Sequence, residues 1–185
     1  NAQVSAFEAA VKENSENKII EIVEKYKEEE NVQIEFEKTK AIWNDILDTI
    51  KVKTPSKELN ILMNGWLVYQ TLASRILGKT GFYQSGGAYG FRDQLQDCFG
   101  IKYINSEYLR KQIINCARHQ FIEGDVLHWW HNETKKGVRT RFSDDLLWLV
   151  YAVIEYIDFE NDKSILDESV EYLNGEVLKE NEEEK

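Results

Sequence analysis

The stretch YQSGGAYGFRDQLQD, from Tyr83 to Asp97, joins glycines and aromatic residues to two carboxylates that could do chemistry. Its glycines allow the backbone to approach a ligand closely. If Phe91 opens a helix, Asp93 lies in the first turn, where the helix dipole stabilises a negative charge, and Asp97 follows on the same face. The alternative for Asp93 is a general acid, because an aromatic, poorly hydrated pocket raises the pKa of a carboxyl group until it can protonate a departing sugar oxygen. Asp97 is expected to be structural, paired with a backbone amide or an arginine.

A second stretch, GDVLHWWH from Gly124 to His131, combines histidines with adjacent tryptophans. Its D-x-x-H-x-x-H spacing, from Asp125 to His131, is a weak metal-site pattern because no clear fourth ligand accompanies it. Adjacent tryptophans point in different directions, so at most one of Trp129 and Trp130 is expected to stack on a ligand. Packing in the core is the alternative for both.

The third stretch, GVRTRFSDD from Gly137 to Asp145, carries Arg139 and Arg141. If the segment is extended, the two guanidinium groups point to the same side and could bind an anion. Surface salt bridges with the acidic background are the alternative. None of the stretches has the glycine spacing of a phosphate-cradling loop. Together they indicate a polar, aromatic-lined site of the kind that carbohydrate chemistry near a phosphate would use.

The elements that hold these residues are expected to be helices. The chain of 185 residues is 42% hydrophobic, has one proline, and shows no convincing strand pattern, so the predicted class is all-α. One or two amphipathic surface helices are expected before Pro55, and later helices over about residues 58–77, from Phe91, and over about 106–120. Ser143 is the expected N-cap of a further helix. Its sequence LLWLVYAVI is apolar all round and requires cover on every side, as in the inner layer of a helical barrel.

Charge and cysteine content limit the partners and the location. The net charge of −10 argues against non-specific binding to nucleic acid or to an anionic membrane. The longest apolar run has nine residues, where a membrane-spanning helix needs about 20, so no membrane contact is expected. Cys98 and Cys116 lack metal-ligand or redox spacing and are expected to be reduced thiols of a cytoplasmic protein.

NGWLVYQTLASRILGKTGFYQSGGAYGFRDQLQD, RHQFIEGDVLHWWH and GVRTRFSDDLLWLVYAVIEYI together resemble the phosphorylases of glycoside hydrolase family 94, formerly glycosyltransferase family 36. Within it they are most similar to the phosphorylase domain of cyclic β-1,2-glucan synthases and to β-1,2-oligoglucan phosphorylases. The resemblance covers roughly residues 60–175. It implies that residues 56–175 are the central part of an (α/α)6-barrel catalytic domain, between a helical lead-in (1–55) and an acidic tail (176–185). Because the family's catalytic domain is far longer, the chain is expected to be a fragment that is inactive alone.

The resemblance also implies a reaction, phosphorolysis of a β-glucosidic bond with inversion to give α-glucose 1-phosphate. The family's general acid falls on Asp93, and its phosphate-binding histidine on His128. Phosphate is already an anionic nucleophile, so one carboxylate suffices, whereas an inverting hydrolase needs a second to activate water. The substrate-binding candidates are aromatic or cationic neighbours: Tyr89, Phe91, Arg92, Trp129, Arg139 and Arg141.

The expected partners are a β-glucan oligosaccharide, phosphate as co-substrate, and the rest of the catalytic domain, with no metal and no other cofactor. Arg139 and Arg141 stand where cellobiose-type members usually carry small or amide residues, which favours the β-1,2-glucan subgroup. Two alternatives remain, namely an inverting hydrolase on the same barrel and a non-catalytic helical module that binds glucan.

Overall fold

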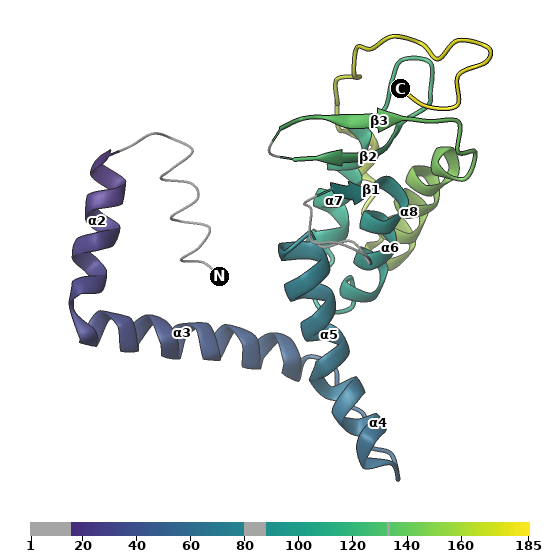
Figure 1. Cartoon of the computed structure of the whole chain (residues 1–185). Coiled ribbons are helices and arrows are strands. Elements are labelled where there is room, and N and C mark those ends of the chain that lie inside the picture. Colours follow the sequence, from purple (N-terminus) through teal and green to yellow (C-terminus); the bar gives the residue numbers. More distant parts are fainter. Residues whose placement is uncertain (1–15, 80–87, 133) are drawn as a thin grey trace. The chain divides into compact units, whose positions relative to one another are not determined.

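The computed structural model describes residues 16–79, 88–132 and 134–185 (Figure 1). It divides the chain into two compact units, Asn1–Lys51 and Val52–Lys185. Residues 80–87 lie outside the described residues, and with them the first part of the glycine-rich motif, residues 83–87, expected to approach a ligand.

The first unit contains two surface helices, α2 (Glu16–Lys27) and α3 (Glu29–Asp48). Glu28 separates them with an extended backbone, and Lys25 Nζ lies 3.0 Å from Glu35 Oε1 across the junction. No residue of α3 is buried. The helices expected before Pro55 are therefore present, and their charged residues form a solvated surface.

The second unit opens with consecutive helical turns where one helix over about residues 58–77 is predicted. They are α4 (Lys57–Ile61), η1 (Leu62–Trp66), α5 (Leu67–Gln70) and η2 (Thr71–Leu77). Ser56 caps the start by accepting the Leu59 N–H at 3.2 Å. Asn64 and Gly65 leave helical backbone angles and interrupt the run. The Asn64 side chain binds the N–H and carbonyl of Val52 at 2.7 and 2.9 Å, which holds the preceding segment against this break.

Three helices form the core of the second unit: α6 (Phe91–Ile101), α7 (Glu107–Ala117) and α8 (Asp145–Glu160). Their buried residues recur at helical spacing, as in Phe91, Leu95 and Cys98 of α6. Both cysteines are free and buried, and burial raises the pKa of Cys98 to about 12. The helix starting at Phe91 is confirmed, whereas the predicted N-cap Ser143 is wrong, because α8 begins at Asp145 with Asp144 as its N-cap.

A small antiparallel sheet lies over one end of these helices (Figure 1) and corrects the all-α prediction. Its strands are β1 (Ala88–Gly90), β2 (Leu127–His131) and β3 (Gly137–Arg139), in the order β1-β2-β3. β1 and β3 have three residues each, too few to show an alternating pattern, and β1 pairs with a strand far along the chain, so no local pattern predicts the sheet. The protein is thus mostly helical with one small sheet.

One face of α8 packs in the core and the other is exposed. Ala152 and Tyr156 are buried, while Leu147 is 69% exposed and Val150 59%. The cover on every side that the sequence predicts for this helix is not found within the described part of the chain. In that same part, no helix is both long and apolar enough to cross a membrane.

The C-terminal segment forms backbone hydrogen bonds with other parts of the second unit rather than extending away as a separate tail. Arg139 and Lys185 exchange both backbone hydrogen bonds at 2.9 Å, and the Leu173 N–H donates to the Gln120 carbonyl at 2.8 Å. The last residues of the segment predicted as an acidic tail, Glu184 and Lys185, therefore pair with Thr140 and Arg139 at the end of β3, and the segment lies on the β3 side of the sheet (Figure 1).

Candidate active site

The turn from β1 into α6 positions Asp93. Gly90 ends β1 and is the N-cap of α6, so Asp93 lies in the first helical turn, as predicted. Its side chain is half-buried, and no hydrogen bond joins its carboxylate to another described residue. The Asp93 charge lies near enough to His128 and Asp97 to contribute to raising the pKa of each. The carboxylate is therefore close to the other titratable groups of the site and is not tied to any of them.

Gly90 makes room for this carboxylate. Its backbone angles, φ −68° and ψ 146°, are ones that any residue adopts. A Cβ atom at this position would, however, lie 2.5 Å from Asp93 Oδ2. The glycine is thus needed for space rather than for its backbone conformation, a role that the sequence motif alone does not reveal.

A bulge in β2 sets the direction of His128. Leu127 pairs with Arg139 and Trp129 pairs with Val138, so the register shifts at the residue between them. The His128 Nδ1–H donates to Asp145 Oδ2 at 2.6 Å, and the imidazole stacks on Phe142 with ring centroids 4.4 Å apart. Asp145 is 3% exposed and His128 33%. The ring is held from two sides and keeps part of its surface accessible.

The carboxylates around His128 favour its protonated form. The hydrogen bond from Nδ1–H to Asp145 is the largest cause that raises the His128 pKa, and the charges of Asp145, Asp144 and Asp93 add to it against desolvation. His119 shows the contrast, because burial lowers its pKa. His128 therefore keeps its positive charge to higher pH than an isolated histidine, and its Nε2–H can donate to an anion.

Asp97 has structural partners. Arg75 donates from Nε at 2.7 Å and Tyr89 donates from its hydroxyl to the same Asp97 oxygen, which confirms the expected pairing with an arginine. Burial raises the Asp97 pKa, and the hydrogen bonds from Tyr89 and Arg75 oppose that rise. Tyr89 is itself buried, and desolvation raises its pKa. The hydrogen bonds of Asp97 thus connect α6 to Tyr89 of β1 and to Arg75 of η2.

The aromatic candidates divide between core and surface. Phe91 is fully buried and meets Trp130 edge-on at 6.3 Å. Trp130 also stacks on His119 with centroids 3.8 Å apart, so this tryptophan packs in the core. Trp129 is half-buried, with its ring edge-on to His131 at 5.6 Å. Of the two tryptophans, Trp129 is the one with surface for a ligand.

Arg92 connects the N-terminal ends of α6 and α8, which hold Asp93 and Asp145. Its Nη1 donates to Asp144 Oδ2 at 2.8 Å, with both side chains nearly half exposed. This joins the first turn of α6, which holds Asp93, to the N-cap of α8, which precedes Asp145. The guanidinium group lies beside the site and remains partly open to solvent.

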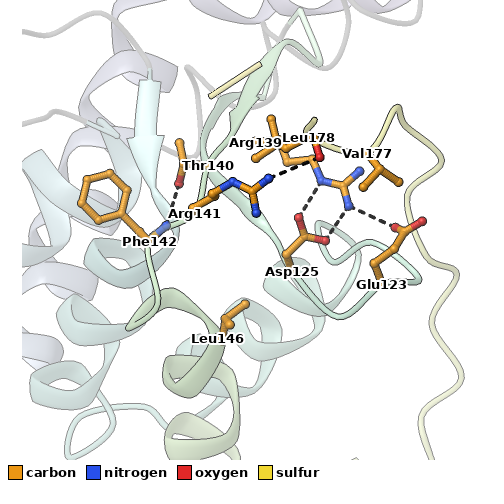
Figure 2. Close-up of a pocket in the computed structure, with 9 residues that line it drawn as sticks. All are labelled: Glu123, Asp125, Arg139, Thr140, Arg141, Phe142, Leu146, Val177 and Leu178. Atoms are coloured by element: carbon orange, nitrogen blue, oxygen red, sulfur yellow. Dashed lines mark hydrogen bonds and ion pairs between the residues drawn. The ribbon is translucent and has the colours of Figure 1, made fainter. Parts of the chain in front are cut away.

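Arg139 is occupied by partners from its own chain (Figure 2). Its Nε and Nη2 bind the two carboxylate oxygens of Asp125 at 2.6 Å each, Nη2 also binds Glu123 at 3.1 Å, and Nη1 donates to the Glu176 carbonyl at 2.9 Å. The guanidinium carbon lies 3.9 Å from the centroid of the Phe121 ring. Arg139 is buried and connects β3 to the loop before β2 and to the C-terminal segment.

Arg139 and Arg141 both line a pocket of about 310 Å³, and Arg141 binds backbone carbonyls (Figure 2). Its Nε donates to the Glu182 carbonyl at 2.8 Å and its Nη2 to the Lys179 carbonyl at 2.8 Å. The two arginines expected to bind an anion therefore hold the C-terminal segment in this structure.

The three side chains of the D-x-x-H-x-x-H pattern do not converge, because each has a different partner. Asp125 binds Arg139, His128 binds Asp145, and His131 lies against Trp129. Within residues 16–79, 88–132 and 134–185, no group of three His, Cys, Asp or Glu side chains could hold a metal ion.

Replacing Arg139 is expected to destabilise the fold. In Arg139→Met, Asp125 and Glu123 lose their cation in a partly buried setting, so the free energy of unfolding should fall by about 3 kcal/mol. Urea titration measures the change. Arg118→Met, which removes the same charge from an exposed position, should change it by less than about 0.5 kcal/mol. Equal effects in both variants would contradict the structural role.

Comparison with known proteins places these residues in a family. Residues 42–181 match the family model described as glycosyl hydrolase 94 superfamily, catalytic domain. The chain is 45% identical over 145 residues to the cyclic beta-(1,2)-glucan synthase NdvB of Rhizobium meliloti (strain 1021), an alignment covering 78% of the chain and 5% of that relative.

Disaccharide phosphorylases are also similar to the chain. Identity is 26% over 180 residues to the N,N'-diacetylchitobiose phosphorylase of Vibrio proteolyticus, covering 82% of the chain and 22% of the relative. It is 26% over 147 residues to the solabiose phosphorylase of Paenibacillus borealis, covering 77% and 17%. The chain spans less than a quarter of the length of these relatives.

Proposed function

The chain belongs to the catalytic-domain family of the glycosyl hydrolase 94 superfamily, and from this membership we propose that it carries the general acid and a phosphate ligand of an inverting β-glucan phosphorylase. The observation that carries the proposal is the pairing of β1 with β2. Gly90 pairs with Trp129, so the turn that holds Asp93 lies beside the bulge that holds His128. An acid and an anion-binding cation thus belong to one site.

In the proposed reaction, Asp93 donates its proton to the glycosidic oxygen as the bond from that oxygen to the sugar C1 breaks. Phosphate, held by the Nε2–H of His128, attacks C1 from the opposite face and forms the new C1–oxygen bond. Inversion of a β-glucoside gives α-glucose 1-phosphate and a shortened glucan. Arg92 and Trp129, both partly exposed beside the site, are the best-placed substrate-binding candidates.

Phosphorolysis is favoured over hydrolysis by the state of the neighbouring carboxylates. An inverting hydrolase needs a second carboxylate free to activate water. Near Asp93, Asp97 accepts from Arg75, Asp144 from Arg92, and Asp145 from His128. Each described candidate for a general base is thus engaged, whereas a phosphate nucleophile requires none.

The proposed setting is part of an (α/α)6 barrel in a longer protein. The exposed apolar face of α8, including Leu147 and Val150, supports this because the remaining helices of such a barrel would cover it. A β-1,2 linkage is supported by the 45% identity to a protein named as a cyclic beta-(1,2)-glucan synthase. Phosphate is the co-substrate, no metal or other cofactor is proposed, and the free, buried cysteines support a cytoplasmic location.

The test uses the whole protein that contains this chain, incubated with β-1,2-glucooligosaccharide in the presence and absence of phosphate. We expect glucose 1-phosphate only when phosphate is present. Release of free sugar at the same rate without phosphate would instead identify an inverting hydrolase. Glucan binding without any product would identify a non-catalytic module.

Filling the space at Gly90 should impair the acid without unfolding the protein. In Gly90→Ala, the new methyl group would overlap the position of Asp93 Oδ2, so the carboxylate must turn away and kcat should fall about tenfold. The melting temperature should change little, because the backbone angles of residue 90 suit alanine. The matched control is Gly100→Ala, also on α6, where an added Cβ meets nothing within 4 Å. Equal kcat values for both variants would show that Gly90 does not position Asp93.

A further inference from the structure

The contact between Asp145 and His128 goes beyond the residues that the motifs and the family resemblance assign. Asp145 comes directly after the N-cap of α8 and is among the few buried charged residues of the described chain. It makes one hydrogen bond with a described side chain, to His128 Nδ1 at 2.6 Å. Burying a carboxylate is unfavourable unless a partner compensates it. The arrangement is the one in which a carboxylate selects the tautomer and orientation of a histidine.

We propose that Asp145 is the positioning residue of the phosphate site, fixing His128 through Nδ1 so that Nε2–H faces the phosphate. This rests on the proposed function. The β2 bulge sends the His128 side chain out of the strand pairing, Phe142 covers one face of the ring, and Asp145 fixes its rotation. With Nδ1 occupied, Nε2 is the nitrogen left to meet a ligand. Asp145 does not contact the phosphate itself.

The same contact sets the pH range over which the site holds phosphate. The carboxylates that face His128 are Asp145 and Asp144 from α8 and Asp93 from α6, and Arg92 of α6 neutralises Asp144 in part. A histidine pKa that is raised keeps the imidazolium present below it and loses that form as pH rises through it. Phosphate binding should therefore weaken as pH rises through the raised His128 pKa. Without the Asp145 charge, the weakening should begin at lower pH.

Two variants separate orientation from charge. Asp145→Asn keeps an oxygen that can accept the Nδ1–H but removes the charge, whereas Asp145→Ala removes both. Asp145→Asn should raise the phosphate KM mainly at higher pH. Asp145→Ala should raise it at every pH, by about tenfold, the lower end of what one hydrogen bond to a charged group contributes. Asp144→Asn, which removes an adjacent charge but not the contact, should shift the pH profile less than Asp145→Asn.

The readout that does not depend on activity is the reaction of His128 with diethylpyrocarbonate, followed by peptide mass spectrometry across a pH series. In the unaltered protein, His128 should become reactive at higher pH than His119, whose pKa is lowered. This comparison needs no variant and holds even if a substitution prevents folding. In Asp145→Asn, the onset of His128 reactivity should move to lower pH.

The outcomes distinguish a failure of the Asp145 positioning role from a failure of the proposed phosphorylase function. An unshifted His128 profile in Asp145→Asn, or a wild-type His128 that reacts at or below the pH of His119, overturns the positioning role even if glucose 1-phosphate is produced. A shifted profile together with a raised phosphate KM supports it. A shifted profile with an unchanged phosphate KM overturns the claim that this contact serves phosphate. A protein that yields no glucose 1-phosphate refutes the proposed function, while the reactivity profile still decides the contact.

Discussion

Asp93→Asn should reduce glucan phosphorolysis by about 10²- to 10⁴-fold, the usual contribution of a positioned general acid. The asparagine has nearly the same shape and still fits beside Gly90, but it has no acidic proton to give to the departing oxygen. The KM for phosphate should change little, because His128 and Asp145 keep their contact. Initial rates of glucose 1-phosphate formation by the whole protein, at saturating phosphate and oligosaccharide, measure the effect.

The matched control is Asp158→Asn, the same change at an exposed position of α8. It should leave the rate unchanged. Asp97→Asn is expected to act differently from Asp93→Asn, because it weakens the ties to Arg75 and Tyr89 that brace α6. It should lower the melting temperature. If Asp93→Asn retains full activity, another residue is the acid.

Replacing His128 should impair the use of phosphate rather than the use of glucan. In His128→Asn, the amide can still donate to Asp145, but the Nε2–H that is proposed to bind the phosphate is gone. The kcat/KM for phosphate should fall by about 10²-fold, because a hydrogen bond to a charged group is worth about 1.5–3 kcal/mol. Initial rates at varied phosphate and fixed oligosaccharide measure this.

The control for that variant is His131→Asn, three residues along the same strand, which should leave the phosphate kcat/KM unchanged. In His128→Asn, the KM for glucose 1-phosphate in the reverse reaction should rise together with the KM for phosphate, because both ligands carry the phosphate group that His128 is proposed to bind. A variant whose phosphate KM equals that of the parent protein would remove His128 from the phosphate site.

The helix that holds Asp93 was predicted correctly. It was expected to begin near Phe91, with Asp93 in its first turn, and α6 begins there. Asp97 was expected to pair with an arginine or a backbone amide, and it pairs with Arg75. The family expected from the three motifs is confirmed by the match of residues 42–181.

Long-range pairing was the part that the sequence could not provide. Strands of three to five residues carry too little pattern to predict, yet the pairing of Gly90 with Trp129 is what places Asp93 beside His128. The C-terminal segment was expected to be an acidic tail, although its pairing with β3 uses backbone groups that every sequence has. Arg139 was expected to bind an anion because an extended segment would point it to the same side as Arg141. Its actual partners, Asp125 and Phe121, lie on another segment that no local pattern connects to it.

Asp145 was missed for a different reason, since a helix-dipole role explains an aspartate near a helix N-terminus. A signal was nevertheless present. Asp145 is seven residues before the buried Ala152, which places both on the same face of α8. A carboxylate on the core-facing side of an apolar helix requires a partner, and His128 is the partner that the sheet supplies.

The central claim, that Asp93 gives its proton to the leaving oxygen, is tested most directly by changing the leaving group. The whole protein and its Asp93→Asn variant are compared on the β-1,2-glucooligosaccharide and on dinitrophenyl β-glucoside, whose phenolate departs without protonation. With phosphate present, the variant should lose about 10²- to 10⁴-fold on the oligosaccharide and keep nearly the parent rate on the activated glucoside. An equal loss on both substrates would contradict the assignment of Asp93 as the general acid.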